Sequence, residues 1–256
     1  YASYFVLFTL LSFAWIDRGE FSLFKTLLKF AVGGRYVGRE LGVFWFISCL
    51  CFSLCAFAAL KALVRSPWAR LLVLTSCYLL AHVESRLLAE GYAIHVPLNL
   101  DVALLAVAYI AMGHHFRGRV RSLLSARFAL PVVSLILLGI LAAEGCGLFR
   151  YSLNMKYVVY PGVPLDLAIP CVFTLFVLQC SHRIAKARGF GFLRWFGYYS
   201  VSIMFWHLAV HEMYLRFFPY HWAVFTVIGS VLPLLIAVLF DKSRVARLLF
   251  LRGAAG

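Results

Sequence analysis

The chain has 256 residues, of which 64% are apolar, 17% are aromatic and only 13% are charged. Soluble domains carry close to a quarter charged residues, so this composition argues against a soluble enzyme. A net charge of +14 would suggest nucleic-acid binding in a soluble protein. Here we assign the Lys and Arg residues to the loops of a membrane protein and expect no nucleic-acid partner.

Apolar runs of about 20 residues recur along the whole chain, which predicts an all-α, polytopic membrane helical bundle. The sequence predicts about eight transmembrane helices, at residues 1–16, 41–60, 67–81, 97–116, 131–148, 163–180, 196–218 and 222–240. Ser66 followed by Pro67 is typical of a helix start. Pro170 and Pro233 lie inside two of the predicted spans and predict kinks there.

The segments between the spans are short, so the sequence predicts a single membrane domain over residues 1–256. Within the longest connection, Phe21 to Val32 is amphipathic and is expected to lie along the membrane interface. The stretch His82 to Val96 is polar, and we expect it to form a connection after the third span.

The charges of alternate loops predict the orientation. One alternating set of loops carries most of the cations and a single acid, Asp241. Its cations are Lys61, Arg65, Arg70, Arg117, Arg119, Arg121, Arg127, Arg183, Lys186, Arg188, Arg194, Lys242, Arg244, Arg247 and Arg252. This pattern predicts that both ends of the chain are cytoplasmic.

The N-terminus and the cysteines add two further expectations. The chain begins YASYFVLF, without Met and without the charged region of a signal peptide, so we expect residues upstream of Tyr1 to be missing. The seven cysteines include no CxxC pair, and most lie in apolar spans, so we expect neither a disulfide framework nor a metal site.

Polar side chains inside the seventh predicted span are candidates for function. His207 and His211 stand one helical turn apart, with Glu212 beside them. Polar groups are costly within a bilayer, which makes them functional candidates. The alternative is that each histidine only forms a hydrogen bond with a neighbouring helix.

Most of the unusual polar residues fall in the predicted non-cytoplasmic half, where they can line one cavity suited to a sugar or another polyhydroxy substrate. The residues predicted to bind the substrate are His207, Arg86, Glu84, Trp45, Lys156 and Asp166. For Glu90, His95 and Arg216 we favour solvated interface positions. The sequence holds no GxSxG, P-loop or HExxH motif, so residue spacing alone indicates no reaction.

Four stretches are similar to the helices of one membrane enzyme family. They are ELGVFWFISCLCF (Glu40 to Phe52), NLDVALLAVAYIAMGHHFR (Asn99 to Arg117), SLNMKYVVYPGVPLDLAIPC (Ser152 to Cys171) and LRWFGYYSVSIMFWHLAVH (Leu193 to His211). In order and spacing they resemble the membrane acyltransferase-3 family, in particular its fucose 4-O-acetylase-like branch. The matching positions are Trp45, Asp101, Gly113, Gly197, Ser200 and His207.

The resemblance implies a ten-span fold of which this chain would lack the N-terminal pair. In the family that pair carries the catalytic Arg and His, so the catalytic His cannot be assigned to any residue here. His207 is therefore a weak catalytic candidate, expected to support the acceptor pocket.

The resemblance also implies a reaction: transfer of an acyl group, usually acetyl, to a hydroxyl of a cell-surface glycan or lipid-linked sugar. Acetyl-CoA or a similar acyl-CoA would be the donor substrate, with no bound cofactor. The implied location is a bacterial inner membrane, in contact with membrane lipid.

Two other interpretations remain open at this stage. Proline-interrupted spans beside a polar cavity are also found in transporters, so a transporter or flippase for a polar lipid-linked sugar is the second hypothesis. The third is an inactive fragment, because of the missing N-terminal helices.

Overall fold

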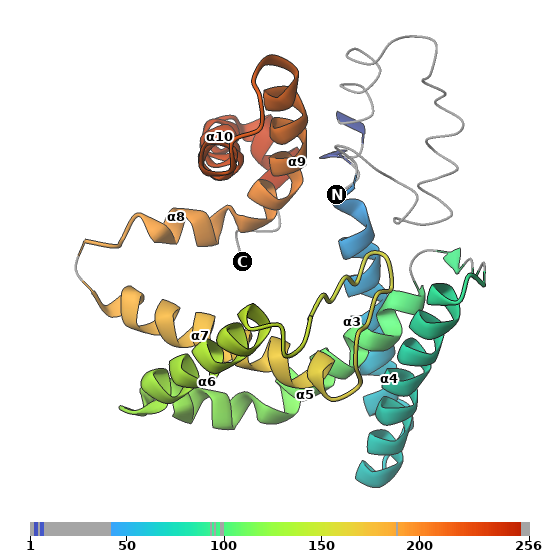
Figure 1. Ribbon diagram of the computed structural model, residues 1–256. Coiled ribbons are helices and arrows are strands. Elements are labelled where there is room, and N and C mark those ends of the chain that lie inside the picture. The colour runs from blue at the N-terminus through green and yellow to red at the C-terminus, as the bar shows by residue number, and fades with distance from the viewer. Residues whose placement is uncertain are drawn as a thin grey trace. The chain divides into compact units, whose positions relative to one another are not determined.

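The computed structural model describes residues 3–4, 6–7, 42–92, 94, 96–97, 100–187 and 189–251 (Figure 1). The first predicted span and the amphipathic stretch Phe21 to Val32 lie largely or wholly outside these residues, as do His95 and Arg252. The described part is helical, which confirms the predicted class, and its one β-type pairing is an isolated bridge between Asn154 and Val159.

Most apolar runs of the sequence do form helices. They are α3 (Phe44–Leu63), α4 (Pro67–Ala89), α5 (Leu100–Ser125), α6 (Ala129–Gly145), α7 (Leu165–Lys186), α8 (Leu193–Tyr198), α9 (Ser200–Phe217) and α10 (Trp222–Lys242), followed by α11 (Arg244–Ala246) and the π-helical turn η4 (Arg247–Leu251). The predicted start of α4 is confirmed, because Ser66 Oγ accepts a hydrogen bond from the Ala69 amide at 3.4 Å and Pro67 occupies the first turn.

The described residues do not support the predicted count of about eight spans. Four helices (α3, α4, α7 and α10) are long and apolar enough to cross a membrane, or five spans if α5 and α6, bent by 108° at their junction, count as one. Helix α6 has 17 residues and is about 25 Å long, which is short for a hydrocarbon core of about 30 Å. Four to five such helices fit a multi-pass membrane protein.

The seventh predicted span is interrupted at Tyr199, which separates α8 from α9 with φ −97° and ψ 14°. The Tyr199 ring is buried, and its hydroxyl donates a hydrogen bond to Asp241 Oδ2 at 2.8 Å. The remaining helix, α9, contains His207, His211, Glu212 and other polar residues, and it is not among the helices apolar enough to span.

The apolar helices keep most of their surface uncovered. In the four candidate spans, only 11% to 17% of the residues in the most apolar window are buried. Large exposed side chains such as Leu72, Leu135 and Val177 lie along these helices. Uncovered apolar surface on this scale is compatible with contact with membrane lipid rather than with water.

The described chain divides into two compact units. In the unit Ile47–Arg188, α4 packs on α5, α6 packs on α7, and α5 contacts α7. At one end of α7, Gln179 Nε2 donates to the Leu123 carbonyl at 2.6 Å, which satisfies a backbone oxygen in the last turn of α5.

The other unit combines Tyr1–Phe46 with Gly189–Gly256. Its centre is the packing of α9 against α10, and η4 folds back against α10. Tyr4 stacks on Phe205 with ring centroids 4.4 Å apart, and its hydroxyl pairs with Ser202 Oγ at 2.7 Å. Tyr199 and Ala237 form a small core where α9 begins.

Candidate functional site

A buried histidine–aspartate pair joins α4 to α7 in the unit Ile47–Arg188. His82 Nε2 lies 2.9 Å from Asp166 Oδ2, and the two residues are 4% and 0% exposed. The other ring nitrogen, Nδ1, lies 2.8 Å from the Tyr78 carbonyl oxygen, which only accepts hydrogen bonds. Nδ1–H therefore donates to this carbonyl and Nε2 is occupied by Asp166, so neither ring nitrogen of His82 is open to a substrate.

The start of α7 holds the Asp166 side chain in place. Asp166 stands in the first turn, where a negative charge is stabilised by the helix dipole. The Gly162 amide donates to Asp166 Oδ2 at 3.0 Å, so this oxygen accepts two hydrogen bonds. Two donors on one oxygen fix the orientation of the carboxyl group.

The backbone carbonyl of Asp166 is satisfied by a side chain from another helix. Pro170 follows four residues later and has no N–H to donate to this carbonyl. The hydroxyl of Tyr109, on α5, donates to the Asp166 carbonyl oxygen instead. Because of Pro170, the Asp166 carbonyl lacks its usual helical donor, and the Tyr109 hydroxyl of α5 takes the place of that donor.

The loop between α6 and α7 is tied to the same place. Ser85 Oγ, one turn after His82, accepts a hydrogen bond from the Tyr160 amide at 2.9 Å, and the Tyr78 hydroxyl donates to the Val163 carbonyl. Between these ties, Val158 is buried with φ at +54°, a conformation that is costly for a β-branched residue. A buried, strained residue of this kind requires strong support from its surroundings.

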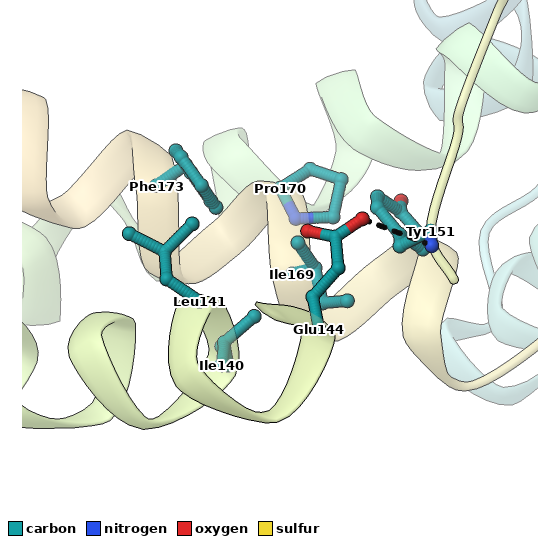
Figure 2. A pocket seen from close by; sticks show the side chains of 7 residues that line it. All are labelled: Ile140, Leu141, Glu144, Tyr151, Ile169, Pro170 and Phe173. Carbon is teal, nitrogen blue, oxygen red and sulfur yellow. Dashed lines mark hydrogen bonds between the residues drawn. The ribbon is translucent and has the colours of Figure 1, made fainter. Parts of the chain in front are cut away.

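A cavity of about 340 Å³ opens beside this cluster, between α6 and α7 (Figure 2). Its lining is mostly apolar and consists of Ile140, Leu141, Glu144, Tyr151, Ile169, Pro170 and Phe173. Glu144 and Tyr151 supply the polar groups, and Glu144 Oε1 accepts a hydrogen bond from the Tyr151 amide at 3.3 Å (Figure 2). Apolar walls with a few polar groups are typical of small-molecule sites.

Two buried oxygens connect the cavity to the His82–Asp166 pair. Tyr151 Oη and Asp166 Oδ1 are both buried, and neither has a hydrogen-bond partner of good geometry among the described residues. Burial and then the negative charge of Asp166 raise the pKa of Tyr151 above its usual value. Tyr151 is therefore a neutral hydroxyl near a carboxylate oxygen that can accept another hydrogen bond.

The two histidines of α9 lie in the other unit and differ from His82. His207 Nδ1 lies 2.6 Å from the Met204 carbonyl and must donate to it, so a neutral ring keeps its lone pair on Nε2. His211 is held the opposite way, with Nε2 donating to the Phe225 carbonyl at 3.0 Å. Its ring stacks on Phe225 with centroids 3.5 Å apart and lies against Gly229.

The six predicted binding residues fall into both units. Trp45 and His207 belong to one, and Glu84, Arg86, Lys156 and Asp166 to the other. In the second unit only Asp166 belongs to the buried cluster. Arg86 is exposed, Glu84 is partly buried, and Lys156 lies over the Tyr157 ring at 5.4 Å. The predicted roles of all six in binding stay predictions.

Sequence reasoning missed most of the partners of Asp166. The polar connection predicted from His82 onward is wrong for its first part, because α4 continues to Ala89 and carries His82 and Ser85 on its buried face. Their spacing from Tyr78, at four and seven residues, is the helical signal that would have revealed this. Pro170, four residues after Asp166, similarly marks a carbonyl in need of a donor.

The comparisons with known proteins add no identity. The chain matches no family model, no curated protein and no solved structure. Among the described residues, no group of three or more His, Cys, Asp or Glu side chains is placed to hold a metal ion.

Proposed function

We propose that the chain is part of an integral-membrane O-acyltransferase. It moves an acyl group, acetyl in the simplest case, from an acyl-CoA donor to a hydroxyl of a cell-surface glycan or a lipid-linked sugar. The observation that carries this proposal is the Asp166 carboxylate. It is fully buried, its Oδ2 is held by His82 and Gly162, and its Oδ1, like the hydroxyl of the cavity-lining Tyr151, has no hydrogen-bond partner of good geometry among the described residues.

This arrangement suits the binding of a hydroxyl group. An acceptor hydroxyl in the cavity has both a donor and an acceptor function, and Tyr151 Oη and Asp166 Oδ1 offer the complementary pair. His82 and the Gly162 amide hold Asp166 Oδ2, so Oδ1 is the oxygen that remains for a further donor. The apolar walls accommodate the non-polar face of a sugar ring or a lipid chain.

The reaction balances as follows. The acceptor oxygen forms an ester bond to the acyl carbon, the carbon–sulfur bond of the thioester breaks, and the departing thiolate takes up a proton. A general base removes the hydroxyl proton. His207, which keeps a lone pair on Nε2, is a supporting residue and a weak candidate for this role.

The test is the acyl content of the surface polysaccharide when the gene is deleted in its host and then restored. We expect deletion to remove O-acyl groups and the wild-type gene to restore them. The Asp166→Asn variant should restore much less, whereas Glu90→Gln, the same acid-to-amide change at an exposed residue where α4 ends, should restore nearly all. An unchanged acyl content after deletion would reject the proposal.

A transporter or flippase for a polar lipid-linked sugar is the second candidate. Irregular helices favour it, because Pro170 lies inside α7, Pro233 lies inside α10, and α5 meets α6 at 108°. Purified protein in liposomes distinguishes the two. Movement of a labelled lipid-linked sugar without any acyl donor would support transport, and acylation that requires the donor would support the enzyme.

A further inference from the structure

The unit that contains α8 to α10 has a second cavity, of about 550 Å³, that differs in chemistry from the first. It is lined by Gly191, Arg194, Trp195, Tyr198, Tyr199 and Asp241. Three aromatic rings, one cation and one carboxylate thus surround a space in the size range of small-molecule sites. We propose that this cavity binds the adenine nucleotide part of a coenzyme A thioester, and this rests on the acyltransferase proposed above.

The aromatic residues form a platform for a base. Trp195 stacks on Tyr199 with ring centroids 5.9 Å apart and an interplanar angle of 19°. Tyr199 is only 2% exposed, whereas Trp195 is 52% exposed. One face of the indole is therefore covered by Tyr199, and its exposed surface is available for a planar ring. Stacking of a nucleobase on an aromatic side chain contributes about 1–3 kcal/mol.

Tyr198 adds an edge to this platform. Its ring meets the Tyr199 ring at 89° with centroids 4.7 Å apart, and the residue is 48% exposed. Tyr198 and Trp195 are therefore two exposed aromatic residues on either side of a buried one. An aromatic corner of this kind offers both a stacking surface and a hydroxyl for a ribose or a base edge.

The charges of the cavity suit phosphate. Asp241 is already compensated, because Arg247 Nε lies 3.2 Å from its Oδ1 and the Tyr199 hydroxyl donates to its Oδ2. Arg194 lines the cavity, is exposed, and has no side-chain partner among the described residues. An unpaired guanidinium beside an aromatic platform is suited to a phosphate group, which it binds through two parallel hydrogen bonds.

Basic residues next to the cavity strengthen its positive charge. Lys242 ends α10, Arg244 and Arg247 follow it, and all three are exposed. A nucleotide with several phosphates is attracted to such a cluster, and the attraction weakens as salt is added. The alternative role for the same residues is to hold the helix ends at the membrane interface, and this role predicts no affinity for nucleotides.

The test is the binding of tritiated coenzyme A to the purified full chain in nanodiscs by equilibrium dialysis. We expect saturable binding that adenosine 3′,5′-bisphosphate displaces and pantetheine does not. Trp195→Leu and Arg194→Gln should each weaken binding about tenfold, in line with the loss of one stacking or one charged contact. Trp222→Leu is the matched control, since Trp222 is also an exposed tryptophan of the same unit, at the end of α10 far from Asp241, and it should bind as the wild type does.

Salt gives a second measurement. Added salt should weaken binding to the wild type more steeply than binding to Arg194→Gln, because only the wild type keeps the guanidinium. Absence of saturable binding, or equal affinity in wild type and Trp195→Leu, would overturn the proposed site.

The site and the acyltransferase proposal fail separately. Nucleotide binding with the expected variants, combined with unchanged surface acylation after gene deletion, supports the site and rejects the enzyme. Loss of acylation on deletion, combined with an unaltered donor KM in Trp195→Leu, supports the enzyme and rejects the site.

Discussion

His82 and Asp166 join α4 to α7 through a buried contact of 2.9 Å between His82 Nε2 and Asp166 Oδ2, while His82 Nδ1 lies 2.8 Å from the Tyr78 carbonyl oxygen. We expect His82→Ala to lower the free energy of unfolding by about 2–5 kcal/mol, because it opens a cavity and leaves the buried Asp166 side chain without this partner. Thermal or denaturant unfolding in detergent measures this.

The double variant His82→Ala, Asp166→Ala should lose less stability than the two single losses combined. In each single variant one buried side chain is left without its partner, and in the double variant neither is. Arg86→Ala, on the exposed face of α4, is the control and should change stability by no more than about 0.5 kcal/mol. Additive losses would show that the two side chains do not interact.

Tyr109→Phe removes the donor that serves the Asp166 carbonyl. The carbonyl then lies bare in a partly buried place, and we expect a loss of about 1–3 kcal/mol in unfolding free energy. Pro170→Ala supplies a backbone N–H at the position four residues later, so in that background Tyr109→Phe should cost clearly less. Equal costs in both backgrounds would contradict the link between Pro170 and Tyr109.

Gly229→Ala should displace His211. A Cβ on Gly229 would stand 1.9 Å from His211 Nε2, far inside contact distance, so the ring must leave the Phe225 carbonyl. We expect a loss of about 1–3 kcal/mol in unfolding free energy, typical of overpacking. Adding His211→Ala should recover part of it. Gly139→Ala, in mid-helix with nothing near its Cβ position, should be neutral or slightly stabilising, as measured by the same unfolding experiment.

His207→Ala should reduce acyl transfer while the protein still inserts into the membrane. The reason is the lone pair that the Met204 carbonyl keeps on His207 Nε2. Initial rates in isolated membranes, normalised to the amount of inserted protein, provide the measurement. His211→Ala is the comparison, because His211 Nε2 donates to the Phe225 carbonyl and a neutral ring keeps its lone pair on the opposite nitrogen, Nδ1. An unchanged rate in His207→Ala would leave this histidine a purely structural role.

Tyr151 predicts a loss of stability at high pH. Its pKa is raised by burial and by Asp166 above the value of 10.0 expected in the unfolded chain. The folded state therefore holds the proton more tightly, and the stability linked to Tyr151 is complete below about pH 10 and falls as the pH rises further. Tyr151→Phe should flatten this fall in a pH series of unfolding free energies. Parallel curves for the two proteins would show that Tyr151 does not titrate in this way.

The positions of the helices could be predicted from the sequence more readily than their number in the membrane. Continuous apolar runs locate α3, α7 and α10 to within a few residues, since nothing else accommodates such runs. Whether a helix crosses the bilayer also depends on its bends and polar residues. The bend between α5 and α6 falls within the basic stretch where the sequence predicts a break between two spans, but no pattern of residues gives its angle of 108°.

The sequence predicted Asp166 as a site residue but not the residues that form hydrogen bonds with it. Asp166 is noticeable because a charged residue in an apolar run is rare. His82 was placed in a connection and not on a helix, because the sequence becomes polar after Ala81. In the structure α4 continues for two more turns, stabilised by the residues on its buried side. That burial results from contacts with α7 and with the loop before it, which lie some 80 residues away in the chain. Local patterns do not contain such contacts.

The bond from Tyr109 to the Asp166 carbonyl fixes how α5 and α7 are aligned along their length. A shift of either helix by a single turn would carry the hydroxyl about 5 Å away and leave a peptide oxygen with no partner in a medium that offers none. Pro170 thus leaves α5 and α7 with one favoured alignment along their length, where two purely apolar helices in a membrane could slide past one another.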